Sequence, residues 1–185
     1  MAAASTIIPN GRPPFRADHI GSLLRPQNLR QAFRQHAAGE ITAEAFRSAQ
    51  DDAIRDVVRL QEDCGLGVVN DGEFRRISYW EKFVRLTQGL TVKEAVFKFH
   101  DDHGHEADFT APYAEGRVSR SAPITLDEFE FVKGLTSAVP KVTVPAPSTM
   151  HLYRFSDYAA PGLYKAPEEF FADLNKPQDH DDDPP

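Results

Sequence analysis

The sequence predicts an α/β protein in which helices flank a parallel sheet. Short apolar segments of strand type alternate with longer segments of helical periodicity, and the connections between them are short. The chain has 185 residues, the size of one domain, and 41% of them are hydrophobic, which suffices for a core. The alternation alone does not distinguish an open sheet from a barrel.

The N-terminal half contains two expected strands and two expected helices. A short strand is expected over residues 15–21 and a helix over residues 29–37. Thr42 can cap the second helix, which should end before Gly65, and a strand is expected over residues 66–70. The apolar positions of this second helix recur at spacings of three and four, which predicts one buried face formed by Phe46, Ala49, Ala53, Val57, Leu60 and Cys64.

The C-terminal half continues the alternation after an interruption. Residues 78–81 and 125–128 each have the Ser/Thr-x-x-Glu spacing of a capping box, so each should open a helix. Residues 88–122 interrupt the alternation of strands and helices and should form extended segments or a hairpin. A third strand is expected over residues 141–144, and Pro167 fits the first turn of a last helix that runs to residue 174.

Two segments join several unusual residues in a fixed order. They are Phe-Arg-Ala-Asp-His-Ile-Gly-Ser-Leu-Leu-Arg-Pro at 15–26 and Val-Val-Asn-Asp-Gly-Glu-Phe-Arg-Arg at 68–76. A weaker third segment, Val-Pro-Ala-Pro-Ser, follows at 144–148. In this order the three segments resemble the cobalamin-independent methionine synthase family, in particular its short, single-barrel members. The resemblance covers roughly residues 12–174.

This resemblance implies a (β/α)8 TIM barrel related to that of uroporphyrinogen decarboxylase. A complete barrel takes about 250 residues and rarely fewer than about 200. The chain is therefore expected to form a partial TIM barrel over residues 15–174, with the first three or four strands and their helices. Residues 1–14 are expected to be a flexible lead. Residues 175–185, which hold four aspartates and three prolines, are expected to be a disordered acidic tail.

The first two segments also supply the candidate binding residues. The working residues of such barrels lie at the carboxyl ends of the strands. Gly21 permits close approach of a ligand, and Ser22 offers a hydroxyl and an amide that suit an amino-acid carboxylate. The resemblance implies that Ile20, Gly21, Ser22 and Glu73 hold homocysteine, with the Glu73 carboxylate receiving the ammonium group. Asp18 and His19 belong to the same segment and are expected in the pocket wall.

Structural interpretations of these residues stand beside the functional ones. Asp-Gly and Gly-Ser are ordinary turn signals. Arg75 and Arg76 can instead be surface partners of Asp or Glu, and a structural role is favoured for them. Trp80 is expected to pack rather than to provide a stacking platform. Ser148 loosely matches a family position near the folate, but it can equally cap a helix over residues 149–154, and the cap is favoured.

Two metal hypotheses arise from the sequence. The tract at 100–106 holds three histidines and three carboxylates, but its spacing matches no helical or finger pattern, so a solvated loop is favoured. The reaction implied by the resemblance transfers a methyl group from a methyltetrahydrofolate to a thiol, with zinc lowering the thiol pKa. The family's zinc ligands (His, Cys, Glu and Cys) come from the second half of the barrel. Cys64 is expected in the core, so the chain alone is predicted to lack the zinc site and to be inactive in methyl transfer.

The composition bears on partners and location. A formal net charge of −7 and the absence of a basic run argue against nucleic acid as a partner. No segment approaches the roughly 20 consecutive apolar residues of a membrane span, and residues 1–14 do not resemble a secretory signal. The single cysteine excludes an intrachain disulfide and fits a reducing compartment, so the cytoplasm is the expected location.

The favoured hypothesis is therefore a truncated methionine synthase-like protein that keeps part of the homocysteine pocket. Two alternatives stay open. A half barrel leaves strand edges unpaired, so the chain could be a non-catalytic binding or assembly module that pairs with itself or with a complementing half-barrel. It could also be another enzyme on the related barrel, such as a uroporphyrinogen decarboxylase-like protein or a different thiol methyltransferase.

Overall fold

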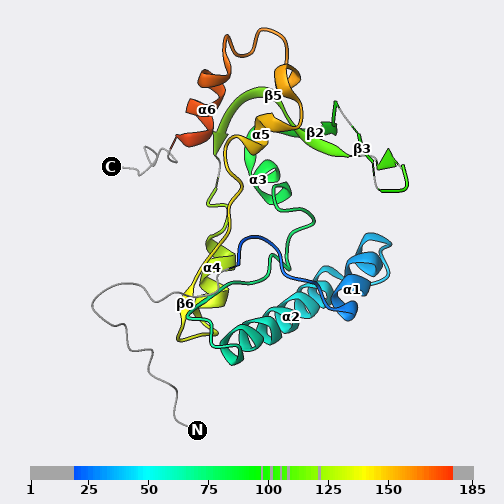
Figure 1. The fold of residues 1–185 in the computed structure, drawn as a ribbon, viewed down its shortest axis with the longest axis vertical. Helices are drawn as coiled ribbons and strands as arrows, with labels where there is room; N and C mark the ends of the chain where they lie inside the picture. The colour runs from blue at the N-terminus through cyan, green and yellow to red at the C-terminus, as the bar shows by residue number, and fades with distance from the viewer. Residues whose placement is uncertain are drawn as a thin grey trace, which may run out of the picture.

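The computed structural model of the protein describes residues 19–96, 98–100, 102–104, 106–107, 109–120 and 122–176. The helices and strands form two groups, as Figure 1 shows. Each group has its own hydrophobic core. The segment between residues 70 and 80 connects the groups, and so does the segment between residues 141 and 148. The candidate site lies beside these two connecting segments.

The first group surrounds a short parallel strand pair. It consists of α1 (Gln27–Ala37), α2 (Ala43–Asp63), β1 (Val68–Val69), α4 (Leu126–Lys133) and β6 (Val139–Pro140). α2 contacts β1, and α4 contacts β6, so each strand has a helix beside it. The buried side chains of this core are Leu29, Ala53, Ile54, Val57, Val58, Val69, Phe74 and Val132.

The second group is built on a long antiparallel hairpin. It consists of α3 (Glu81–Arg85), β2 (Thr87–Glu94), β5 (Thr110–Arg120), α5 (Thr149–Leu152) and α6 (Pro167–Asn175). A register shift between residues 88 and 90 interrupts the pairing of β2 with β5. The minor elements are β3 (Phe99–His100), β4 (Glu106–Ala107) and a 3₁₀ turn (Phe155–Asp157). The buried side chains of this core are Trp80, Val84, Ala114, Val118, Met150, Tyr158, Phe170 and Leu174.

The parallel pair determines where the site can form. Val68 lies opposite Val139, and Val69 lies opposite Pro140. The Lys141 amide donates to the Val69 carbonyl at 2.8 Å, which keeps the two chains together where both strands end. Because parallel strands end at the same edge, the segments after β1 and after β6 emerge side by side.

The structure confirms the elements that strong local signals predicted. α1 and α2 form where helices were expected, and the Thr42 hydroxyl accepts from the Ala45 amide at 3.2 Å as the α2 cap. The interruption over 88–122 contains the β2–β5 hairpin. Pro167 begins α6, and Trp80 packs in the second core. α6 includes Asn175, which the prediction had assigned to the tail, and residues 177–185 of that tail lie outside the described part.

The predicted buried face of α2 is partly wrong. Leu60 is 59% exposed, and Cys64 is exposed at the C-cap instead of lying in the core. The buried stripe instead includes two glutamines, because their amides serve backbone groups of the segment after β1. Gln61 Nε2 donates to the Asn70 carbonyl at 2.8 Å, and the Asn70 amide donates to Gln61 Oε1 at 3.0 Å. Gln50 Nε2 donates to the Phe74 carbonyl at 3.4 Å.

Several predicted boundaries are also wrong. The helix expected from residues 78–81 starts at Glu81, with Trp80 at the N-cap, and the buried Ser78 hydroxyl has no hydrogen bond among the described residues. Thr125 occupies the N-cap of α4 without a side-chain bond. The third strand lies at 139–140 rather than 141–144, because its pairing with β1 ends at Pro140. The expected first strand is irregular over 19–21, and its residues 15–18 lie outside the described part.

The observed fold is thus α/β, with one parallel strand pair among the described residues. Within the same residues, no helix has both the length and the apolar character that crossing a bilayer requires.

Candidate functional site

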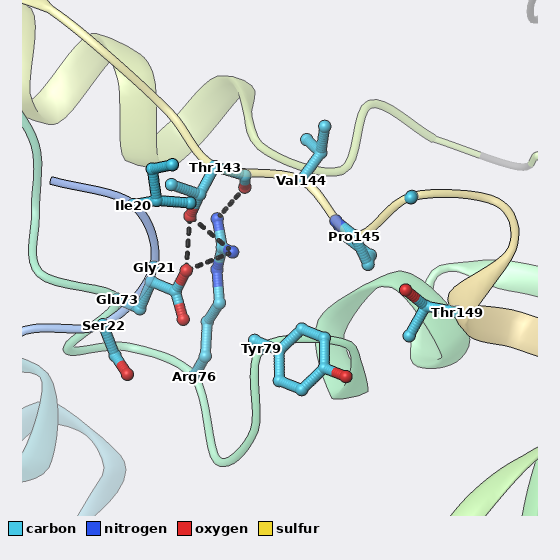
Figure 2. Close-up of a pocket in the computed structure, with 11 residues that line it drawn as sticks. Ile20, Gly21, Ser22, Glu73, Arg76, Tyr79, Thr143, Val144, Pro145 and Thr149 are labelled. Carbon is cyan, nitrogen blue, oxygen red and sulfur yellow. Dashed lines mark hydrogen bonds and ion pairs between the residues drawn. The ribbon is translucent and has the colours of Figure 1, made fainter. Parts of the chain in front are cut away.

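A pocket of about 430 Å³ lies where the two groups of elements meet. Figure 2 shows that three separate segments line it: residues 20–22, the connection from β1 to α3, and the connection from β6 to α5. Its lining residues are Ile20, Gly21, Ser22, Glu73, Arg76, Tyr79, Thr143, Val144, Pro145, Ala146 and Thr149. The pocket therefore depends on contacts between residues more than 100 positions apart in sequence.

A tight turn after β1 aims Glu73 into this pocket. Asn70 Oδ1 accepts from the Gly72 amide at 2.8 Å, and Asp71 Oδ1 accepts from the Glu73 amide at 2.9 Å. Gly72 and Glu73 have φ values of 66° and 59°, both in the left-handed region. For a glutamate this conformation costs roughly 1–2 kcal/mol, and such strained residues concentrate at functional sites. The side-chain bonds of Asn70 and Asp71 hold the strained turn in place.

The Glu73 carboxylate is almost fully enclosed, with a side-chain exposure of 4%. The Thr143 hydroxyl donates to Oε1 at 2.5 Å, and Arg76 Nη1 lies 3.7 Å from the same oxygen. In Figure 2 the other carboxylate oxygen lies on the side away from Thr143 and has no marked interaction with the residues drawn. One oxygen of Glu73 is thus held by Thr143, while Figure 2 marks no interaction for the second.

Arg76 connects Glu73 to a buried ion-pair network. Its guanidinium donates to Glu128 from Nε at 3.3 Å and from Nη2 at 2.5 Å. Lys82 Nζ lies 3.1 Å from the same carboxylate and 2.6 Å from Asp127. Burial alone would lower the pKa of Arg76, but the hydrogen bond and charge of Glu128, with smaller effects of Asp71 and Glu73, raise it. Arg76 therefore stays charged.

Asp71, two residues before Glu73, is a further buried carboxyl group that does not line the pocket. Its Oδ2 atom is buried and makes no hydrogen bond among the described residues. Burial raises the pKa of Asp71, and the negative charge of Glu128 raises it further, against the opposing effects of the Glu73 amide and of Arg76.

The first sequence segment is joined directly to this turn. The Leu23 amide donates to the Gly72 carbonyl at 3.1 Å. Arg25 Nη2 donates to the carbonyls of Glu73 at 3.2 Å and Arg76 at 2.5 Å. Burial lowers the pKa of Arg25, and the charge of Glu73 partly opposes this effect. These bonds place residues 20–22 beside the Glu73 carboxylate, with the Ile20 side chain 93% exposed.

Tyr79 closes the opposite side of the pocket. Its hydroxyl and that of Tyr153 lie 2.5 Å apart, which joins the connection before α3 to the end of α5. The Tyr153 ring packs against Phe109 with ring centroids 4.8 Å apart. Burial and the hydrogen bond to Tyr153 raise the pKa of Tyr79, so its side chain lines the pocket as a neutral phenol.

The structure brings most of the candidate residues together. Ile20, Gly21, Ser22 and Glu73 line the one pocket described above. His19 is not among the lining residues; its carbonyl accepts a hydrogen bond from Lys141. Asp18 lies outside the described residues.

Other predicted residues take different positions. Ser148 is exposed at the N-cap of α5, but its hydroxyl makes no capping bond and it does not line the pocket. α5 ends at Leu152 rather than at residue 154. Arg75 pairs with a carboxylate as expected, with Nη2 2.5 Å from Asp51 Oδ1 and the guanidinium 4.6 Å from the Phe131 ring centroid, but its side chain is buried and not at the surface.

Sequence reasoning missed several lining residues as parts of the site, among them Arg76, Tyr79 and Thr143. Arg76 was interpreted only as a structural residue, although it stands in the second segment. The signal for Thr143 is its position just after a parallel strand, where barrel-type proteins place working residues.

The described residues do not fit a zinc site of the expected kind. They contain no group of three or more His, Cys, Asp or Glu side chains close enough to share a metal. The single cysteine of the sequence, Cys64, is exposed at the end of α2, and the pocket lining includes neither cysteine nor histidine. In the tract at 100–106, Asp101 and His105 lie outside the described residues.

The fold and the pocket define an α/β protein with a pocket at the carboxyl ends of two parallel strands. Residues 15–156 match the model of the family described as cobalamin-independent synthase, catalytic domain. The chain belongs to this family, as the two sequence segments predicted.

Individual relatives agree with this assignment. The Bacillus subtilis protein YxjH is 34% identical over 166 residues, which cover 88% of this chain and 42% of that protein. The methionine synthase of Sulfolobus acidocaldarius is 32% identical over 158 residues, covering 85% of this chain and 44% of that protein. The chain therefore spans less than half the length of these relatives.

A solved structure agrees as well. The putative vitamin-B12 independent methionine synthase from Listeria monocytogenes superposes with a TM-score of 0.65 at 27% identity, over 87% of this chain and 45% of that one. A B12-independent methionine synthase from Shewanella, solved in complex with selenomethionine, shares the fold with a TM-score of 0.56 at 24% identity, over 73% of this chain and 37% of that one.

Proposed function

We propose that the pocket binds the amino-acid part of a homocysteine-like thiol. The observation that carries this proposal is the convergence of Ser22 and Glu73 on one pocket, at the carboxyl ends of parallel strands. The complex of the Shewanella relative with selenomethionine supports it, because selenomethionine carries the same amino-acid group.

The chemistry of the pocket suits a zwitterion. Glu73 lines the pocket, and its oxygen without a marked interaction in Figure 2 can accept a charge-assisted hydrogen bond from the substrate ammonium. The Ser22 hydroxyl and the backbone around Gly21 can donate to the substrate carboxylate. The substrate side chain would then extend along the wall formed by Tyr79, Pro145 and Thr149.

Calorimetric titration with L-homocysteine under reducing conditions tests this proposal. A hydrogen bond to a charged group is worth about 1.5–3 kcal/mol, so Glu73→Gln should weaken binding about 10- to 100-fold. Glu40→Gln is the matched control, because Glu40 is exposed in the connection between α1 and α2. The proposal is wrong if the folded wild type does not bind, or if the two variants bind equally well.

We further propose that the chain is part of a methionine synthase-like methyltransferase with a (β/α)8 barrel, of the 5-methyltetrahydropteroyltriglutamate–homocysteine type. The β1–β6 pair with α2 and α4 corresponds to part of such a barrel. Zinc would activate the thiol and methyltetrahydrofolate would supply the methyl group, but the residues described here offer no zinc site. The 185-residue chain alone should therefore not form methionine from homocysteine and methyltetrahydrofolate with zinc added. Clear turnover would contradict this. A role of Ser148 near the folate stays a prediction.

Association with a complementing half-barrel or with a second copy is a related proposal. Leu24 and Leu60 are exposed and line an apolar groove between the N-terminal segment and α2. Exposed apolar surface of this kind favours association. Size-exclusion chromatography with light scattering tests it, and a monomer at all concentrations would count against a second copy as the partner.

A further inference from the structure

Thr143 occupies a particular position between Glu73 and Arg76. Its hydroxyl lies 2.5 Å from Glu73 Oε1 and 3.2 Å from Arg76 Nη1. Arg76 itself is 3.7 Å from the same Glu73 oxygen, which is too long for a direct hydrogen bond. The threonine hydroxyl therefore bridges two charged groups that do not bond to each other.

The direction of these hydrogen bonds follows from the chemistry of the groups. A guanidinium can only donate, so the Thr143 oxygen must accept from Arg76. The single hydroxyl proton is then free to point to Glu73, whose ionised carboxylate can only accept. Arg76 therefore donates a hydrogen bond to Thr143, and Thr143 donates one to Glu73; Figure 2 marks both contacts.

Further hydrogen bonds of Arg76 hold this arrangement in place. Arg76 Nη2 donates to the Thr143 carbonyl at 2.8 Å, which ties the same residue at its backbone. The bonds from Arg76 to Glu128 fix the orientation of the guanidinium plane. Thr143 lies three residues after the end of β6, so the strand pairing helps to set its distance from the turn after β1.

We propose that Thr143 is a positioning residue, whose hydroxyl fixes one oxygen of Glu73 and thereby presents the other oxygen to the ligand ammonium. This inference rests on the proposed function of Glu73 in binding an amino acid. Without the hydroxyl, the carboxylate loses its one short hydrogen bond, and both oxygens become free to turn toward Arg76 and away from the pocket.

Two variants separate the hydroxyl from the shape of the side chain. Thr143→Val keeps the branched shape and removes the hydroxyl, whereas Thr143→Ser keeps the hydroxyl. In titrations with L-homocysteine we expect Thr143→Val to weaken binding about 10-fold or more and Thr143→Ser to stay within about 3-fold of the wild type. Equal losses in both variants, or no loss in either, would overturn the proposal.

A double-mutant cycle tests the contact without any ligand. Thr143→Val should lower the folding equilibrium constant about 10-fold in the wild-type background and clearly less in the Glu73→Gln background. Additive effects would overturn the contact between Thr143 and Glu73. Thr87→Val is the matched control, because the Thr87 hydroxyl is buried without a hydrogen bond among the described residues, and it should show no coupling to Glu73.

The ligand titrations and the double-mutant cycle test the two proposals separately. Failure of the folded wild type to bind L-homocysteine overturns the proposed function, while the cycle still decides whether Thr143 holds Glu73. Binding that Glu73→Gln abolishes but Thr143→Val leaves intact overturns the positioning role alone.

Discussion

Removal of the Arg76 side-chain charge is the most informative test of the buried network. Arg76→Met keeps an unbranched apolar stem but deletes the guanidinium, and with it two hydrogen bonds to Glu128 and two to Thr143. Breaking a buried ion pair by removing one partner costs about 3–5 kcal/mol. Lys82 remains 3.1 Å from Glu128 and retains part of the charge compensation, so we expect the lower end of that range, about 3 kcal/mol.

Urea unfolding followed by far-UV circular dichroism measures this loss, and the fluorescence of Trp80, the only tryptophan, reports separately on the second core. Arg59→Met is the control. Arg59 and its partner Asp56 have side-chain exposures of 72% and 78% and lie 3.6 Å apart, so this variant should change stability by less than about 0.5 kcal/mol. A loss below about 1 kcal/mol for Arg76→Met would refute the argument that this network stabilises the fold.

Three further predictions concern other positions. Burial raises the pKa of Asp71 from its ordinary value of 3.8, so ionisation of Asp71 disfavours the folded state. The stability of Asp71→Asn relative to the wild type should therefore grow as pH rises above 3.8. Urea unfolding over a pH series measures this difference, and a difference that does not change with pH would contradict the prediction. Gly72→Ala places a Cβ 2.8 Å from the Phe74 ring at a φ of 66° and should lower the free energy of unfolding by about 2–3 kcal/mol. Gly39→Ala, with a φ of 72° and open space around it, should lower it by about 1 kcal/mol. Equal losses on urea unfolding would count against the clash with Phe74. Cys64 should react with a thiol reagent in the native protein without denaturant, and protection until unfolding would show that it is buried after all.

Local signals in the sequence predicted the elements that depend on neighbouring residues. The Thr42 cap, the hairpin within 88–122 and the Pro167 helix start are all of this kind. The face of α2 was predicted less well, because a pattern of apolar residues treats glutamine as exposed. Gln61 is buried since it bonds both backbone groups of Asn70, and that partner becomes visible only in three dimensions.

The site was predictable to the extent that short segments contain it. Ser22 and Glu73 stand in two segments of unusual composition, and the structure places both at one pocket. Thr143 contacts Glu73 across 70 positions of sequence, through the pairing of β1 with β6. No spacing rule within the chain relates such residues. The ion pair of Arg76 with Glu128 was missed for the same reason.

The raised pKa of Asp71 also bears on the charge of the ligand. Burial comes first among its causes, and the negative charges of Glu128 and Glu73 add to it, so the surroundings of Asp71 disfavour a further negative charge. A bound ammonium group beside Glu73 would oppose that effect and lower the pKa of Asp71. Because the ligand then favours the ionised form of Asp71, its affinity should rise with pH across the range in which Asp71 titrates in the free protein. L-Selenomethionine is the suitable probe, since it has no thiol to titrate, and Asp71→Asn should abolish the dependence. An affinity that stays constant over that range in the wild type would show that the ligand does not place its positive charge at Glu73.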